Sequence, residues 1–218
     1  MVESQLLHDP DGVETTSGGP YHVFTPFWKK VRKENLLRTG PPLDVPDLAR
    51  PETWPSSEPV EALALRPEAR DGVDWAGGLR DTWVPTEAGA HDRRQYTLDH
   101  VLGRYEDSRD RPDQDGTARL SPYLHHGQIS PRQVWHRVRS WADDTGRYDD
   151  ARPLLRQVVF REFSYHWCHH YPNTPDTTYR DKFTDFPWRE DDEALARWKR
   201  GETGYPIVDA GMRQLYEI

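Results

Sequence analysis

The chain has 218 residues, of which 34% are hydrophobic and 30% are charged, and it is rich in proline (19) and glycine (15). Its formal net charge of −8 argues against general coating of nucleic acid, although it does not exclude a local basic patch. The single cysteine, Cys168, excludes an internal disulfide and fits a reducing compartment. Without a signal peptide or a long apolar run, we expect a cytoplasmic protein with no membrane partner.

The N-terminal part of the chain shows little helical patterning. Residues 20–28, which read PYHVFTPFW, are briefly apolar and aromatic, and residues 29–33 predict a short helical start. Prolines then recur between residues 41 and 85, which predicts an extended connector with a short turn at 61–64. The tryptophans expected to pin this connector to a surface are Trp54, Trp75 and Trp83.

From residue 86 onward the pattern is all-α, and no strand or internal repeat is recognisable. The expected helices span residues 92–106, 121–127, 130–141, 151–171, 191–199 and 206–218. In the first of them, Tyr96, Val101 and Leu102 are expected to share one face. Ser130 precedes Pro131, and Gln133 completes a capping box at the start of its helix.

Residues 154–171 form the longest stretch without proline or glycine. Helical spacings of three and four place large aromatic side chains on one side, namely Phe160, Phe163 and Trp167. The same spacings form a polar stripe beside them, made of Gln157, Arg161 and Ser164. Buried polar groups need partners from the protein or from a ligand, so this helix is expected to do more than support the fold.

Residues 115–121, which read DGTARLS, bring two hydroxyls and an arginine to a helix start. Backbone N–H groups point outward there, so the segment suits a phosphate. The alternative is that Ser121 only caps the helix.

Histidines gather near the end of the long helix. His166 and His169 have a spacing at which two histidines can share a metal, but apart from the adjacent pair at residues 125–126 no second cluster supports such a site. We therefore expect core or surface histidines and no metal. The chain also shows no nucleophile–base set, no nucleotide loop of the Gly-Lys-Ser type and no close carboxylate pair.

Three segments resemble consecutive signature segments of the DNA photolyase/cryptochrome family. They are GTARLSPYLHHGQISPRQVW at 116–135, RQVVFREFSYHW at 156–167 and KRGETGYPIVDAGMRQL at 199–215. In addition, PYHVFTPFWKK at 20–30 resembles the end of the family's N-terminal antenna-binding domain. The resemblance keeps the family's order and covers nearly all of residues 18–218.

This resemblance implies a mainly α chain in which residues 86–218 form the first half of the helical domain that holds FAD folded into a U. Residues 1–30 would be the tail of a truncated α/β domain, and residues 31–85 the interdomain connector. The chain would then be an internal fragment, and we expect it to be inactive alone and not to retain FAD. An antenna pigment such as a folate or a deazaflavin would need the absent N-terminal domain.

The resemblance also implies roles for individual residues. The residues expected to bind FAD are Tyr105, Thr117, Ala118, Arg119, Leu120, Ser121, Leu154 and Arg161. The residues expected to contact DNA are Arg109, Gln157 and Phe160. The expected catalytic residues are Gln157, Phe160 and Trp188, the last as the outermost tryptophan of an electron-transfer chain. The family often has a second hydroxyl where Ala118 stands, so one phosphate hydrogen bond worth about 1 kcal/mol is expected to be lost.

The implied activity is that of a monomeric lyase that repairs UV-damaged DNA. Reduced FAD excited by blue light passes an electron to a flipped-out pyrimidine dimer, which splits and returns the electron. Many repair photolyases have a glutamate where Gln157 stands and a tryptophan where Phe160 stands. Gln157 can donate an N–H but cannot supply a proton, and Phe160 has a weaker π face. Two alternatives therefore stay open: a cryptochrome-like photoreceptor without repair activity, and a non-functional truncated gene product.

Overall fold

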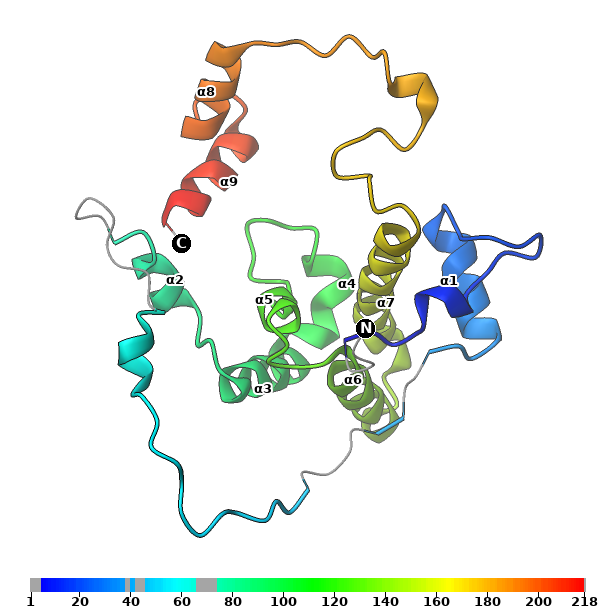
Figure 1. Cartoon of the computed structure of the whole chain (residues 1–218). Helices are drawn as coiled ribbons and strands as arrows, with labels where there is room; N and C mark the ends of the chain where they lie inside the picture. Colours follow the sequence, from blue (N-terminus) through cyan, green and yellow to red (C-terminus); the bar gives the residue numbers. More distant parts are fainter. Residues whose placement is uncertain (1–4, 38–39, 42–45, 66–73, 218) are drawn as a thin grey trace. The chain divides into compact units, whose positions relative to one another are not determined.

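The computed structural model describes residues 5–37, 40–41, 46–65 and 74–217, and all regular elements among these residues are helical (Figure 1). In chain order they are η1 (Pro10–Gly12), α1 (Phe24–Lys33), η2 (Val60–Leu63), α2 (Gly77–Thr82), α3 (Glu87–Tyr96), η3 (Thr97–Val101), η4 (Leu102–Arg104), α4 (Tyr105–Ser108), α5 (Ser121–His125), α6 (Pro131–Thr145), α7 (Tyr148–His170), η5 (Asp181–Phe183), α8 (Asp192–Arg200) and α9 (Pro206–Glu217). The mainly α fold expected from the sequence is confirmed.

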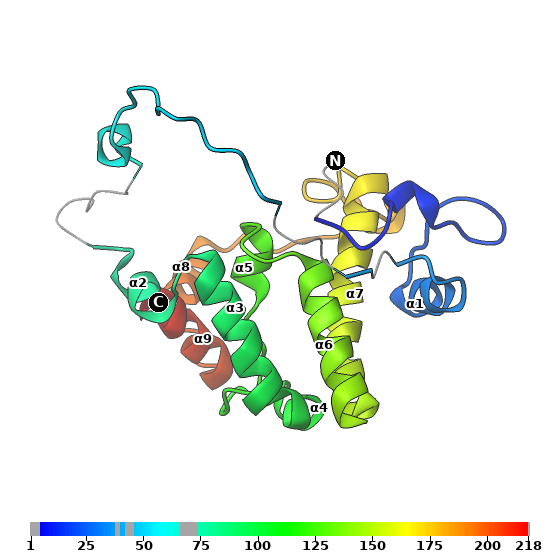
Figure 2. The same ribbon diagram turned by 90° about the horizontal axis from the view of Figure 1, so that it is seen from below.

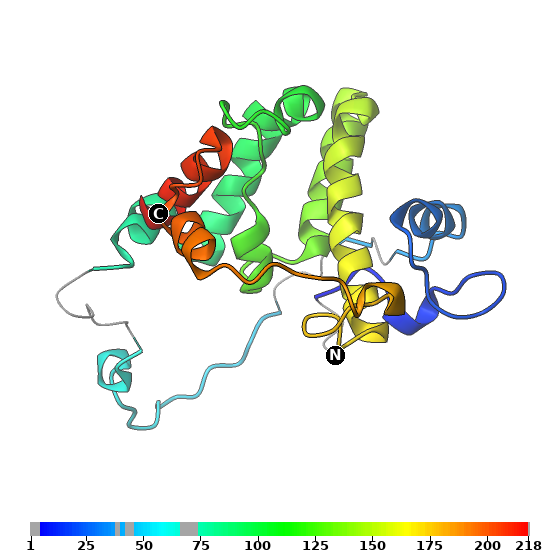
Figure 3. The same cartoon turned by 90° about the horizontal axis from the view of Figure 1, so that it is seen from above.

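The chain divides into two compact units, one built from residues 1–44 and 85–184 and the other from residues 45–84 and 185–218. The core of the first unit includes the contact between α6 and α7, which lie side by side (Figures 2 and 3). The buried face of α6 recurs every four residues, through Val134, Val138 and Ala142. A fully buried valine such as Val134 or Val138 stabilises the fold by about 1.5–3 kcal/mol.

The ends of α6 follow from local sequence signals. The Ser130 hydroxyl accepts the Gln133 backbone N–H at 3.1 Å, and the Gln133 side-chain oxygen accepts the Ser130 N–H at 2.8 Å, which confirms the predicted capping box. The helix continues past the expected residue 141 to Thr145, because no helix-breaking residue stands before Gly146. Gly146 has a φ of 71°, which is the left-handed conformation that ends helices.

The predicted helix over residues 92–106 is present but irregular. After α3, the π-helical turn η3 and the 3-10 turn η4 interrupt it before the short helix α4. Val101 and Leu102 are buried as expected, whereas Tyr96 is 41% exposed, which corrects its predicted place on the same face. The π turn changes the register of the helix, so that a simple helical spacing no longer relates Tyr96 to the residues after it.

The N-terminal helix α1 begins at Phe24 and not at residue 29. Its buried residues are Phe24, Phe27 and Val31, whose spacing of three and four forms one helical face. This face packs against the aromatic stripe of α7, where the Phe24 and Phe160 rings stack with centroids 3.6 Å apart. Segments far apart in the sequence thus share one aromatic cluster.

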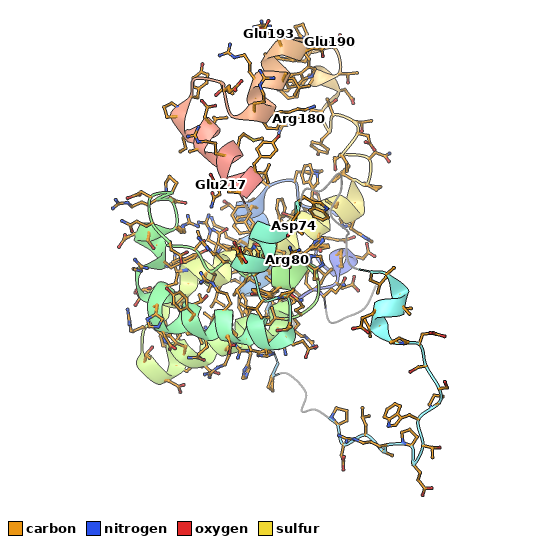
Figure 4. All side chains as sticks on the ribbon, turned by 90° about the vertical axis from the view of Figure 1, so that its left-hand side faces the viewer. Asp74, Arg80, Arg180, Glu190, Glu193 and Glu217 are labelled. Carbon is orange, nitrogen blue, oxygen red and sulfur yellow. The ribbon has the colours of Figure 1, made fainter. Side chains whose placement is uncertain are left out.

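The proline-rich stretch at residues 41–85 contains two helical elements, η2 and α2. The turn η2 confirms the prediction near residues 61–64, but the sequence did not indicate α2. Asp74 precedes α2, accepts the Ala76 N–H at 3.3 Å and forms an ion pair with Arg80 (Figure 4). The expectation that tryptophans pin this stretch is wrong for Trp54, which is 76% exposed. Trp75 is likewise exposed, and Trp83 is half-buried.

In the second unit, α8 packs against α9. The Asp191 side chain caps α8 by accepting the Ala194 N–H at 2.8 Å, and Glu190 and Glu193 flank the same helix start (Figure 4). The segment before α9 is held by Asp209, which accepts the hydroxyl of Thr203 at 2.6 Å and two backbone N–H groups. These hydrogen bonds lower the pKa of the Asp209 carboxyl. No described helix is long and apolar enough to cross a membrane.

Candidate functional site

A cavity of about 660 Å³ opens within the first unit, between the 117–121 segment and α7. Its lining residues are Tyr105, Thr117, Ala118, Arg119, Leu120, Ser121, Leu124, His125, Val134, Leu154, Gln157, Val158, Arg161 and Tyr165. Every residue that the sequence predicts to bind a cofactor belongs to this lining. A cavity of this size, whose lining combines apolar side chains with polar and charged ones, is typical of a ligand site.

The loop before α5 is fixed from the side of α3 and η4. Arg93 donates to the carbonyl oxygens of Thr117 and Ala118, each at 2.9 Å, and Thr97 adds a bond to Ala118 O at 3.3 Å. The carbonyl of Asp115 accepts from Arg104 at 3.3 Å. Because the loop carbonyls are already bound, the loop is held in place before any ligand arrives.

The hydroxyls of this loop are free to bind a ligand. Within the described part of the chain, neither the Thr117 nor the Ser121 hydroxyl makes an intramolecular hydrogen bond, and Ser121 does not cap α5. The alternative explanation of Ser121 as an N-cap is therefore wrong. Arg119 has a φ of 49°, a left-handed conformation that is uncommon outside glycine, and its side chain pairs with Asp115 at 3.1 Å.

Tyr105 closes the cavity from α4 and is only 7% exposed. Burial raises the pKa of its phenol, so the hydroxyl stays protonated and can donate a hydrogen bond at neutral pH.

The opposite wall is α7, which presents Gln157, Arg161 and Tyr165 to the cavity. These residues are four apart, so they lie one above the other on a single helix face. The Arg161 guanidinium lies over the Tyr165 ring at 4.6 Å and donates to the Gln5 carbonyl at 2.9 Å. The sequence prediction missed Tyr165, although its spacing from Gln157 and Arg161 could have identified it.

Three predicted site residues lie outside the cavity wall. Phe160 stacks on Phe24 and is 38% exposed. Trp188 belongs to the second unit and is 76% exposed. Arg109 follows α4 as its C-cap, and its Nη2 lies 3.5 Å from the Asp110 carboxylate, while its buried Nε has no partner among the described residues. The roles predicted for these three residues stay predictions.

The histidines near the end of α7 are explained by contacts with the N-terminal segment. His166 is fully buried and uses both ring nitrogens, because Nε2 accepts the Tyr21 N–H at 3.2 Å and Nδ1 lies 3.1 Å from the Pro10 carbonyl. His169 pairs with the Asp11 carboxylate at 2.8 Å, and His170 lies 3.1 Å from the same Pro10 carbonyl. Asp11, His169 and His170 each offer one atom that could bind a metal, and these atoms lie within 4.8 Å of one another, so the expectation of no metal stays a prediction.

Comparison with known proteins gives the same family from two parts of the chain. Residues 154–218 match the family described as the FAD binding domain of DNA photolyase, and residues 1–48 match the family described as DNA photolyase.

Individual relatives match almost the whole chain. A deoxyribodipyrimidine photo-lyase of Agrobacterium fabrum is 42% identical over 214 residues, covering 98% of this chain and 43% of that protein. Cryptochrome-2 of Arabidopsis thaliana is 31% identical, covering 97% of this chain and 36% of that protein. The crystal structure of a bacterial class III photolyase from Agrobacterium tumefaciens superposes with a TM-score of 0.85 at 41% identity, covering 98% of this chain and 43% of that chain. The chain thus spans less than half the length of these relatives.

Proposed function

Because the chain belongs to the DNA photolyase/cryptochrome family, we propose that the protein containing it uses FAD in the cavity between residues 117–121 and α7 to repair pyrimidine dimers in DNA under blue light. The observation that carries this proposal is that all residues predicted to bind the cofactor line one cavity, from two opposite walls. Family resemblance proposes these residues one by one, and the cavity supports the proposal because it brings them together around one space.

The chemistry of the wall fits the parts of FAD. Arg119 and the free hydroxyls of Thr117 and Ser121 can bind phosphate oxygens, and Ala118 contributes no side-chain donor. The apolar side chains Leu154 and Val158 can pack against flat rings. The cavity therefore offers both kinds of surface that a flavin dinucleotide needs.

Bound FAD would supply light-driven electron transfer, and the side chains of the wall would bind and orient the reacting groups. The Gln157 amide can donate an N–H to a carbonyl oxygen on which negative charge develops, but it has no acidic proton to give. The Arg161 guanidinium adds a fixed positive charge on the same helix face.

The proposal is tested by illuminating the protein that contains this chain with blue light in the presence of dimer-containing DNA. We expect flavin bound in a one-to-one ratio and dimers that disappear only in the light. A protein that binds FAD and leaves the dimers intact would instead act as a photoreceptor. Phe160 does not separate the two functions, because one face of its ring stacks on Phe24 while the side chain is 38% exposed outside the cavity lining.

Replacement of Gln157 tests its proposed contact with the lesion. Gln157→Leu removes the N–H donor, and we expect the repair yield per absorbed photon to fall tenfold or more, because one hydrogen bond to a developing charge is worth roughly 1.5–3 kcal/mol. Gln157→Glu should raise the yield, because a carboxylic acid can also supply a proton. The matched control is Gln95→Leu on α3, where Gln95 pairs with Asp99 away from the cavity. An unchanged yield in both Gln157 variants would show that this side chain does not face the lesion.

A further inference from the structure

The side chain of Glu162 is fully buried and joins two parts of the molecule. One carboxylate oxygen accepts the Leu7 backbone N–H at 2.6 Å and lies 3.3 Å from His8 Nδ1. The other oxygen accepts from Arg161 Nη1 at 3.0 Å. A buried carboxylate is tolerated only when such partners replace its water, so each of these contacts is needed to keep the charge inside the protein.

Arg161 is shared between this buried cluster and the cavity. Its Nη1 group donates both to Glu162 and to the Gln5 carbonyl, at 3.0 and 2.9 Å. The other N–H groups of the guanidinium have no hydrogen-bond partner among the described residues, and the side chain lines the cavity. A guanidinium carries five N–H donors, so this arrangement leaves donors available to a ligand.

The contact between Arg161 and Glu162 is unusual for a helix. Adjacent residues on a helix point about 100° apart and do not normally face each other. The arginine therefore bends toward the buried carboxylate, and the stack on Tyr165 at 4.6 Å supports it from the next turn. The direction of the guanidinium is thus determined by Glu162 and by the N-terminal segment.

We propose that Glu162 is a positioning residue, which couples the docking of residues 5–8 on α7 to the orientation of Arg161 toward the flavin. This inference rests on the proposed binding of FAD in the cavity. Beyond that function, the N-terminal segment contributes to flavin affinity although it lies about 155 residues away from Glu162 in the sequence. It does so through the Leu7 backbone N–H and the Gln5 backbone carbonyl. The coupling is reciprocal, so FAD should in turn stabilise the docked segment.

A double-mutant cycle measures this coupling. Glu162→Gln keeps the volume and one acceptor for the Leu7 N–H but removes the charge that holds Arg161. In the protein that contains this chain, we expect it to raise the Kd for FAD about tenfold, read from the fluorescence of released flavin. Arg161→Gln should weaken binding at least as much. If Glu162 acts through Arg161, the double variant binds FAD no more weakly than Arg161→Gln alone.

A matched control and a second measurement keep the test decisive. Ser164→Ala, on the same helix, removes only a bond to the Phe160 carbonyl and should leave the Kd unchanged. In the unmodified protein, FAD should slow hydrogen exchange of the Leu7 amide more than tenfold, a readout that does not depend on the folding of any variant. The positioning role would be overturned if the losses of FAD binding free energy in the two single variants add up in the double variant. It would also be overturned if FAD leaves the exchange rate of the Leu7 amide unchanged. Both outcomes would leave FAD binding itself established. A protein that binds no FAD at all would instead remove the proposed function and this inference with it.

Discussion

Gly116→Ala should prevent the 115–121 loop from packing against α4, and it should sharply weaken FAD binding in the protein that contains this chain. A Cβ atom at this position would collide with the Ser108 carbonyl oxygen and lie 2.6 Å from the carbonyl carbon. Both atoms belong to the backbone of α4, so neither can move aside as a flexible side chain would. The constraint is space and not backbone conformation, because Gly116 is not among the glycines with positive φ.

The expected cost is about 1–3 kcal/mol in the free energy of unfolding, which is the usual range for forcing an extra carbon into a filled site. The Kd for FAD should rise tenfold or more, because the Thr117 and Ser121 hydroxyls move with the loop. Urea denaturation and the flavin-to-protein ratio after purification measure the two effects. Gly211→Ala on α9 is the control: its added Cβ meets no atom within 4 Å, and alanine favours a helix. Equal behaviour of the two variants would contradict the close packing of Gly116.

Helix positions could be predicted where the signals are local. Ser130 with Gln133 marks the start of α6, and Asp191 with Gly201 marks both ends of α8. These signals act within one helical turn, so the sequence contains all the partners that they require. The π turn after α3 could not be predicted in this way, because it accompanies a tertiary bond from Thr97 to the Ala118 carbonyl.

The candidate site was predicted by family resemblance and not by physical pattern. The 117–121 segment alone left Ser121 open to explanation as a cap, and only the fold brings Arg161 and Tyr105 to the same cavity. Glu162 was not singled out, because its partners Leu7 and His8 are about 155 positions away in the sequence. Periodicity shows that an aromatic stripe exists on α7, but it does not show that the partner of this stripe is α1.

Acid should destabilise the first unit through His166. The neutral ring satisfies both neighbours: Nε2 accepts the Tyr21 N–H, so the proton on Nδ1 donates to the Pro10 carbonyl. Protonation of Nε2 would place two N–H groups against each other. Burial, together with the nearby His170, His8 and His169, lowers the pKa of His166 to about 4.

The lowered pKa of His166 determines whether acid raises or lowers the free energy of unfolding. The folded pKa of about 4 lies below the unfolded value of 6.5, so the unfolded state binds more protons between these pH values. The stabilisation is fully present above pH 6.5 and is lost as the pH falls toward 4. We expect a loss of about 2–3 kcal/mol in the free energy of unfolding over this window, from 1.36 kcal/mol per pH unit with an allowance for solvent screening.

A pair of glutamine variants isolates this contribution. His166→Gln cannot titrate, yet its amide can still accept from Tyr21 and donate to Pro10. Its free energy of unfolding, measured by urea denaturation at pH 7 and pH 4.5, should fall less with acid than that of the unmodified chain. His126→Gln, at an exposed histidine outside the core, should keep the original pH dependence. If both variants lose stability in acid as the unmodified chain does, His166 is not the group that takes up a proton on unfolding, and its proposed role in the acid sensitivity is wrong.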